Sequence, residues 1–193
     1  MIFASNNAHK LSEVRSILSP RPVLSLSDIG FVGEIEETGA TLEANSLIKA
    51  QAVVDWLAEK GQEEWVFADD TGLEIEALGG EPGVRTARWA GEPACDANNR
   101  KKALEELKGQ SNRRAQFRTV ITLMKGQEMY QVEGVVKGRI ETEERGDHGF
   151  GYDSLFVPEG YEETFAQLPE AVKNSISHRA RALQALLVKL NSL

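Results

Sequence analysis

Two adjacent acids, Asp69 and Asp70, directly follow the apolar run Val66-Phe67-Ala68. Neighbouring carboxylates repel each other and aspartate is disfavoured inside a strand, so solvent, backbone donors or a cation must offset the cost. If the strand geometry continues through this pair, the two side chains point to opposite faces of the sheet. We therefore expect one aspartate to face a cleft while the other serves the scaffold.

Two more acids, Glu36 and Glu37, lie in the polar segment 34–41, which we expect to be a loop. Carboxylate oxygens, completed by substrate phosphates and water, are the ligands that Mg²⁺ prefers in proteins. Loop acids are usually no more than solvated side chains, so this pair alone establishes no metal site. Together with Asp69 and Asp70, these glutamates are the candidate metal ligands of the chain.

The segment "SNNAHK", residues 5–10, separates an expected strand from an expected helix. A strand-to-helix turn exposes backbone N–H groups at the positive end of the helix dipole, which suits an anion. Asn7 is suited to cap this helix, and Lys10 on its first turn could meet a phosphate. An ordinary N-cap followed by a solvated lysine is the alternative. No G-x-x-x-x-G-K-[ST] phosphate loop occurs in the chain.

The segment "GFGYDSLF", residues 149–156, places an aromatic residue between two glycines. Glycine lets the backbone approach a ligand closely, and Phe150 or Tyr152 could stack on a planar base. A tight turn between core aromatic residues explains the same pattern equally well.

A cationic group, Lys173, His178 and Arg179, is expected at the head of the closing helix. Helix N-termini normally favour acids, so these cations indicate an anionic or carbonyl-bearing ligand there. Arginines that simply decorate the surface are the alternative.

The elements that must position these residues follow from hydrophobic periodicity and from glycine and proline. Strands and helices alternate in the first half, and two adjacent strands in the second half predict a hairpin, so we expect a mixed-sheet α/β protein. The expected strands are 1–4, 22–26, 65–69, 115–124 and 129–140. The expected helices are 10–19, a long helix that ends near Gly61, 96–108, and a closing helix with an apolar stripe from Ala180 to Leu190. Residues 71–72 are expected to form a turn, and residues 78–94 a long ordered loop.

Length and composition narrow the class of protein. The 193 residues suit one large domain or two joined lobes, and the net charge of −8 argues against a general nucleic-acid binder. Cys95 is the only cysteine, so no internal disulfide forms and a reducing compartment is expected. The N-terminus is too short and polar for a signal peptide, and no run reaches the ~18 apolar residues of a membrane span. We expect a cytoplasmic protein.

Five blocks taken in order resemble the inosine/xanthosine triphosphate pyrophosphatase family. They are "SNNAHKLSEV", "EETGATLEANSLIKA", "ADDTGLEIEALGGEPGVRTARWAG", "GFGYDSLF" and "KNSISHRARAL", and they cover almost the whole chain. The resemblance implies a single two-lobed domain over residues 1–193, with an elongated mixed β-sheet, flanking helices and an active-site cleft between the lobes. It also implies Mg²⁺-dependent hydrolysis of non-canonical purine nucleoside triphosphates (ITP, dITP and XTP) to the monophosphate and pyrophosphate, and a homodimer.

The resemblance assigns a role to each matching residue. Asp70 is implied to be the catalytic carboxylate, which holds Mg²⁺ and orients or deprotonates water. Glu36, Glu37 and Asp69 are implied as the other metal ligands, with the choice between the two glutamates open. The residues implied in substrate binding are Ser5, Asn6, Asn7, Ala8, His9, Lys10, Lys49, Thr71, Phe150, Gly151, Tyr152, Asp153, Lys173, His178 and Arg179.

Two alternatives stay open at this point. A related enzyme could cleave other modified nucleotides on a similar two-lobed fold, although the F-G-Y-D and S-H-R blocks favour purines. A nucleotide-sensing or RNA-binding module without turnover should have lost its acids or gained a basic face. This chain keeps all four acids and is acidic overall, which favours the enzyme.

Overall fold

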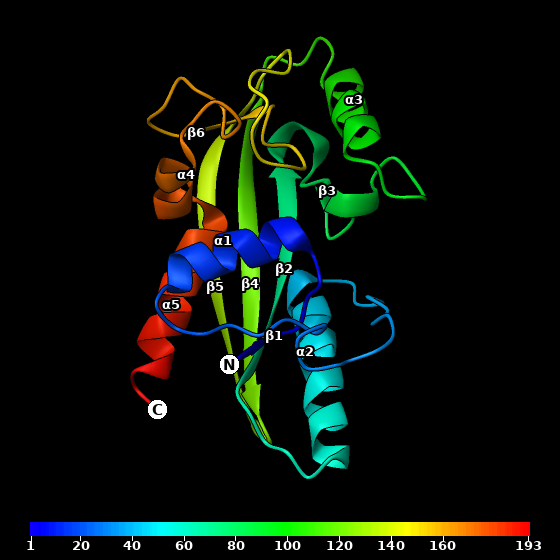
Figure 1. Cartoon of the computed structure of the whole chain (residues 1–193). Helices are drawn as coiled ribbons and strands as arrows, with labels where there is room; N and C mark the ends of the chain where they lie inside the picture. Colours follow the sequence, from blue (N-terminus) through cyan, green and yellow to red (C-terminus); the bar gives the residue numbers. More distant parts are fainter. The chain divides into compact units, whose positions relative to one another are not determined.

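The computed structural model describes all 193 residues as a mixed sheet with flanking helices (Figure 1). The sheet order is β1-β2-β4-β5-β6, with β3 paired to β2, and it combines parallel (β1–β2) and antiparallel (β2–β3, β5–β6) neighbours. The expected mixed-sheet α/β fold is therefore confirmed. The strands are β1 (Ile2–Phe3), β2 (Val66–Ile75), β3 (Pro82–Gly83), β4 (Arg114–Lys125), β5 (Glu128–Ile140) and β6 (Phe156–Pro158), and the α-helices are α1 (Ala8–Leu18), α2 (Leu42–Glu59), α3 (Asp96–Glu106), α4 (Glu170–Ile176) and α5 (His178–Leu190).

The chain divides into two compact units. Unit 1 comprises Met1–Asp70, Thr119–Gly134 and His178–Leu193, and unit 2 comprises Thr71–Arg118 and Val135–Ser177. The expected active-site cleft between two lobes stays a prediction, and so does the description of residues 1–193 as a single domain. No helix is both long enough and apolar enough to cross a membrane.

In unit 1 the sheet carries a separate apolar cluster on each face. Val66 and Ala68 of β2 pack in the cluster that contains α2, whereas Phe67 packs in the cluster that contains α1 and α5. This alternation is the two-residue period of a strand. Continued by two residues, it directs Asp70 to the α2 face and Asp69 to the α1/α5 face.

Capping residues and a glycine set the ends of the helices of unit 1. The side chain of Asn7 caps α1 by accepting a hydrogen bond from the Lys10 N–H, as expected, and Thr41 caps α2 in the same way. Gly61, with φ of 67°, follows α2 and satisfies the Ala58 carbonyl, which confirms it as the terminator.

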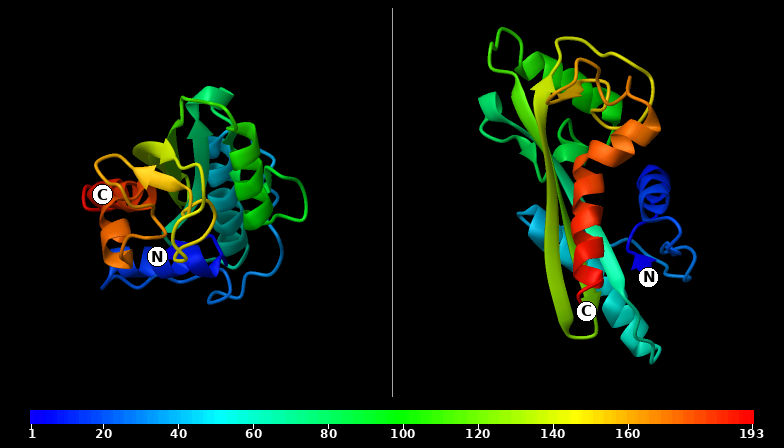
Figure 2. Two further views of the ribbon diagram at one scale, coloured as in Figure 1. Left: turned by 90° about the horizontal axis from the view of Figure 1, so that it is seen from above. Right: turned by 90° about the vertical axis from the view of Figure 1, so that its left-hand side faces the viewer.

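Helix α5 runs along β5 (Figures 1 and 2). Their close approach requires a residue without a side chain, because a Cβ on Gly134 would overlap the backbone of His178 and Ala182. This contact places the first turn of α5, and therefore Arg179, against the sheet.

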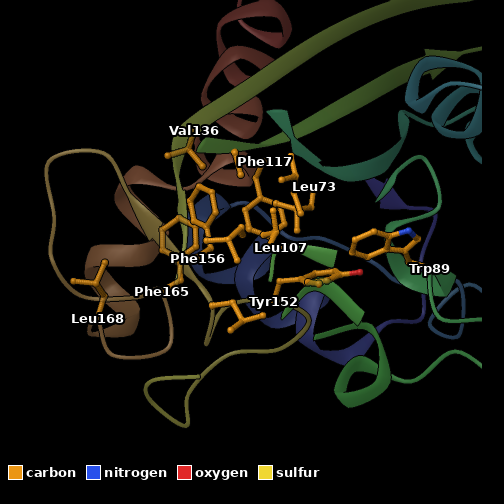
Figure 3. Packing of buried hydrophobic residues seen from close by; sticks show 14 residues of the cluster. Leu73, Trp89, Leu107, Phe117, Val136, Tyr152, Phe156, Phe165 and Leu168 are labelled. Carbon is orange, nitrogen blue, oxygen red and sulfur yellow. The ribbon is translucent and has the colours of Figure 1, made fainter. Parts of the chain in front are cut away.

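Unit 2 has its own apolar core, built on Phe117 and Phe156 with Tyr152 and Trp89 at one side (Figure 3). The rings of Phe117 and Phe156 meet edge to face with centroids 4.8 Å apart, a favourable arrangement for aromatic pairs. The core fixes the segment around residue 152, which was a candidate for ligand binding.

Three local expectations are wrong. Residues 22–26 make one isolated bridge, Ile2 to Leu24, because Pro22 has no N–H and the Ser25 N–H is taken by Asp28. The expected turn at 71–72 is strand, since β2 continues to Ile75 and pairs with β3. The closing helical region is two helices, α4 and α5, so Lys173 is not at the head of the last one.

Candidate active site

Asp69 is held by two cations on the α1/α5 face of unit 1. Lys10 Nζ donates to Oδ1 at 2.8 Å, and Arg179 donates to Oδ2 from Nε at 3.2 Å and from Nη2 at 3.1 Å. Asp69 is only 3% exposed, and burial alone raises the pKa of its carboxyl group, but Lys10 and Arg179 outweigh burial. The pKa of Asp69 therefore lies well below its usual range, and this carboxylate is ionised and satisfied.

Arg179 is itself clamped between two acids. Its Nη1 donates to Oε2 of Glu13, a buried residue of α1. Burial lowers the pKa of the Arg179 guanidinium, but Asp69 and Glu13 raise it by more than burial lowers it. The pKa of Arg179 is therefore raised above its usual value. Glu13 is not among the site residues predicted from the sequence. Its position in the sequence could have indicated a role, because Glu13 lies three residues after Lys10 and therefore on the same face of α1.

Asp70 faces the opposite side, where its partners are different. Lys49 of α2 lies 3.4 Å from Asp70 Oδ1 and 3.0 Å from Glu37 Oε2, so one ammonium bridges two carboxylates. The other oxygen, Asp70 Oδ2, is buried and accepts no hydrogen bond. Burial raises the pKa of Asp70 and Glu37 raises it further, while Lys49 opposes both. These contacts confirm that the two aspartates face opposite sides, whereas the different roles expected of them stay a prediction.

The four candidate metal ligands are not equivalent. Asp70 and Glu37 share Lys49, and Asp70 has an oxygen without a hydrogen bond, whereas both oxygens of Asp69 are bonded to cations. Glu36 is exposed. No group of three or more acidic, histidine or cysteine side chains is arranged to hold an ion. A pair of carboxylates that leaves positions for phosphate and water fits Mg²⁺, which usually binds through one or two carboxylates.

The segment 5–10 forms the turn that precedes α1. Ser5 Oγ accepts from the Asn7 N–H at 3.1 Å, and Asn6 Oδ1 accepts from the backbone and hydroxyl of Ser27, each at 2.9 Å. Ala8 begins α1, and His9 is exposed on it. Polar side chains therefore order the segment, and Lys10 reaches Asp69 of the site.

In unit 2, residues 149–153 form a tight turn. Asp153 Oδ2 accepts from the Phe150 N–H at 2.9 Å and from Lys173 Nζ at 2.7 Å. Gly149 has φ of 78°, and a Cβ there would overlap the Asp153 carboxylate. Phe150 is half-buried, with the Lys173 ammonium 5.0 Å from its ring centroid. This turn presents Phe150 as a possible stacking surface.

Tyr152 lies in a different environment from Phe150. It is 3% exposed within the unit 2 core (Figure 3). Its hydroxyl donates to the Thr86 carbonyl at 2.8 Å. Burial, with the nearby charge of Asp96, raises the pKa of Tyr152 well above its usual value. The ring of Tyr152 belongs to the apolar core, so its burial favours the alternative of a tight turn between core aromatic residues over stacking on a base.

The remaining candidates are distributed over both units. His178 is buried at the start of α5 in unit 1, next to Arg179. Thr71 is half-buried on β2, and Gly151 follows Phe150, both in unit 2. Lys10, Lys49, Asp69, Asp70 and Arg179, which come from four elements of unit 1, are thus brought together, as are Phe150, Asp153 and Lys173 in unit 2.

The Ham1 family model matches residues 1–189. The chain belongs to this family. Among its relatives are proteins named dITP/XTP pyrophosphatase from Flavobacterium johnsoniae, 45% identical over 97% of this chain and 95% of the relative, and from Bacillus subtilis, 47% identical over 96% and 93%.

Solved Ham1 structures also match. The Staphylococcus aureus Ham1 protein aligns with a TM-score of 0.86 at 38% identity, covering 99% of this chain and 97% of that one. A HAM1 protein from Coxiella burnetii aligns with a TM-score of 0.88 at 37% identity, covering 100% and 98%. The family resemblance found in the five sequence blocks is therefore confirmed.

Proposed function

We propose that this protein hydrolyses non-canonical purine nucleoside triphosphates, namely ITP, dITP and XTP, to the monophosphate and pyrophosphate. The observation that carries the proposal is Asp70, a buried carboxylate with one oxygen free of hydrogen bonds, next to Glu37 and Lys49. Relatives at 45% and 47% identity are named dITP/XTP pyrophosphatase, which supports dITP and XTP among these substrates.

The chemistry is assigned to Asp70 and its neighbours. Asp70 and Glu37 would hold Mg²⁺, which supplies neutralisation of the polyphosphate charge and polarisation of the phosphorus–oxygen bonds. Asp70 is also the residue that orients the attacking water or accepts its proton, since a general base must lie within hydrogen-bond reach of the group it deprotonates. Its raised pKa moves it towards the range useful for a base.

The phosphates are assigned to Lys10 and Lys49. Both lysines pair with acids, Lys10 with Asp69 and Lys49 with Asp70 and Glu37. An acidic protein needs local cations to hold a polyphosphate, and the capped N-terminus of α1 adds backbone N–H groups beside Lys10. Asp69 is then a positioning acid that orients Lys10 and Arg179 rather than a metal ligand.

The base is assigned to Phe150, His178 and Arg179. Phe150 offers a stacking surface that any purine can use, so it contributes affinity more than choice. Hypoxanthine and xanthine carry a 6-keto acceptor where adenine carries a 6-amino donor. A guanidinium only donates hydrogen bonds, so Arg179 would favour the keto base and oppose adenine. Lys173, paired with Asp153, supports the stacking residue.

The test is pyrophosphate release from ITP with Mg²⁺, compared with ATP and with ITP in excess chelator. We expect release from ITP far above release from ATP, and its loss with the chelator. Folded protein that binds ITP but releases no pyrophosphate would contradict the proposal and favour a nucleotide sensor. Release from modified pyrimidine nucleotides in preference to ITP would favour the related-enzyme alternative.

We further propose that the protein works as a cytoplasmic homodimer. The lone cysteine supports a reducing compartment, and dimerisation rests on the family resemblance. Light scattering during size-exclusion chromatography measures the oligomeric state directly.

A further inference from the structure

Helix α3 contributes two charged side chains to the turn that carries Phe150. Asp96 Oδ2 accepts from the Gly151 N–H at 2.8 Å, and Arg100 Nη1 donates to the Gly151 carbonyl at 3.0 Å. Both polar groups of the residue after Phe150 are therefore held by one helix. We infer that Asp96 and Arg100 are positioning residues, which fix Phe150 for purine stacking; this rests on the proposed function.

The two side chains are spaced to act together. Residues 96 and 100 lie one helical turn apart, so they project from the same face of α3. Arg100 is itself oriented by Glu144, whose Oε2 accepts from Nε at 2.8 Å. An arginine held at one nitrogen presents another in a defined direction, which makes its contact with the Gly151 carbonyl specific.

The turn needs this external support because its own backbone is unusual. Gly151 has φ of 60° and Gly149 has φ of 78°, and glycine at such positions is conformationally free in the unfolded chain. On the other side of Phe150, Asp153 binds the Phe150 N–H and pairs with Lys173. Phe150 thus lies between two fixed peptide groups, one held by Asp153 and one by α3.

The same helix holds a second segment that touches this turn. Asn99, 1% exposed, donates to the Ala87 carbonyl and accepts from the Ala90 N–H, each at 2.8 Å. The Tyr152 hydroxyl binds the Thr86 carbonyl in that segment. Contacts therefore run from α3 to residues 86–90, on to Tyr152 and back through Gly151 to α3. Because these contacts already order the turn, less conformational entropy is lost when a base stacks on Phe150.

The test measures base affinity apart from phosphate affinity. We compare Arg100→Met and Asp96→Ala with the wild type for KM and kcat on ITP, and for inhibition by inorganic tripolyphosphate, which has no base. Lys101→Met is the matched control, because Lys101 is a neighbouring, exposed cation of α3. Asp96→Asn should restore function, because an amide oxygen still accepts the Gly151 N–H.

We expect KM for ITP to rise about tenfold in Arg100→Met, which is ~1.4 kcal/mol, with kcat and tripolyphosphate inhibition within about twofold of the wild type. In a Phe150→Ala background the Arg100 change should then have little further effect, since the two act through one contact. Thermal unfolding confirms that each variant is folded, and Asp96→Ala repeats the comparison should Arg100→Met not fold.

Three results would overturn the inference. They are an unchanged KM in both variants, equal weakening of ITP and tripolyphosphate, and an Arg100 effect that persists undiminished without Phe150. A wild-type protein that releases no pyrophosphate from ITP would instead refute the proposed function, so the two failures are distinguishable.

Discussion

The two faces of β2 at residues 69 and 70 are built differently, although the side chains are neighbours in sequence. On the α1/α5 face, Asp69 bonds through both oxygens to Lys10 and Arg179, and its pKa is lowered. On the α2 face, Asp70 has one long contact with Lys49 and one oxygen without a hydrogen bond, and its pKa is raised. The first carboxylate is satisfied by the fold, and the second is left with bonding capacity for something else.

This difference teaches how one dipeptide can serve structure and chemistry together. A buried acid with all its oxygens bonded is inert but anchors the elements around it. A buried acid that lacks partners costs stability, and such sites concentrate where function requires them. The following changes test this contrast, beginning with the largest expected effect.

Asp70→Asn should remove nearly all turnover, because an amide neither accepts a proton from water nor binds a cation strongly. General-base assistance alone contributes ~10²–10⁴-fold, and loss of a metal ligand adds to it. Pyrophosphate release from ITP at saturating Mg²⁺ measures the loss. Near-normal turnover would show that Asp70 has another role.

Asp69→Asn should act mainly on stability. It leaves Arg179 and Lys10 facing a neutral amide, and breaking a buried ion pair costs ~3–5 kcal/mol in unfolding free energy. Urea denaturation measures this cost, and Asp70→Asn is the matched control. Asp70 has an oxygen without a hydrogen bond and a raised pKa, so removing its charge should lower the free energy of unfolding by less than ~1 kcal/mol. If both variants lose the same free energy of unfolding, the two faces of β2 do not differ as described.

Arg179→Lys should narrow the preference for ITP over ATP by about tenfold, a size typical of one lost polar contact to a base. Lysine is preferable to alanine here, because it keeps a positive charge between the buried acids Glu13 and Asp69. The ratio of kcat/KM for ITP and ATP measures the change. If kcat/KM for ITP and kcat/KM for ATP fall by the same factor, Arg179 binds phosphate or has a structural role only.

Lys49→Met should tighten Mg²⁺ binding in the absence of nucleotide by about tenfold while it lowers turnover. The Lys49 ammonium bridges Asp70 and Glu37, and a like charge ~4 Å from a cation opposes it by up to ~4 kcal/mol near a protein surface. Isothermal titration measures the affinity, and Lys60→Met, beyond the end of α2, is the control. Unchanged or weaker binding would place the ion elsewhere.

The two aspartates should also differ in sign in their contribution to stability against pH. Because the pKa of Asp69 is lowered by folding, its stabilisation is present above the unfolded pKa of about 4 and declines as pH falls further. The pKa of Asp70 is raised, so its ionisation reduces stability as pH rises above that value. Urea denaturation in chelator from pH 3 to 7 should therefore give slope changes of opposite sign in Asp69→Asn and Asp70→Asn, each at most ~1.4 kcal/mol per pH unit.

Much of this arrangement could be predicted from local patterns. The strand expected at 65–69 predicted that Asp69 and Asp70 face opposite sides if its geometry continues, and the contacts confirm it. The Asn7 cap and the Gly61 terminator were also predictable, because both depend on residues close in sequence. The order of five motifs predicted the family, which the match over residues 1–189 confirms.

Other features required partners that are distant in the chain. The turn expected at 71–72 is strand because β2 pairs with β3, and Tyr152 is a core residue because Thr86 and the aromatic cluster surround it. Glu13 acquires its place in the site only through Arg179, 166 positions away.

The sequence by itself determined which residue types were available, the period of most elements and the family. The tertiary structure alone decided which acid is satisfied and which retains an oxygen without a hydrogen bond. The physical reason is that the pKa and the reactivity of a carboxylate depend on burial and on the charges within a few ångströms. For Asp69 and Asp70 those charges come from α1, α2 and α5, segments that only folding brings beside the strand.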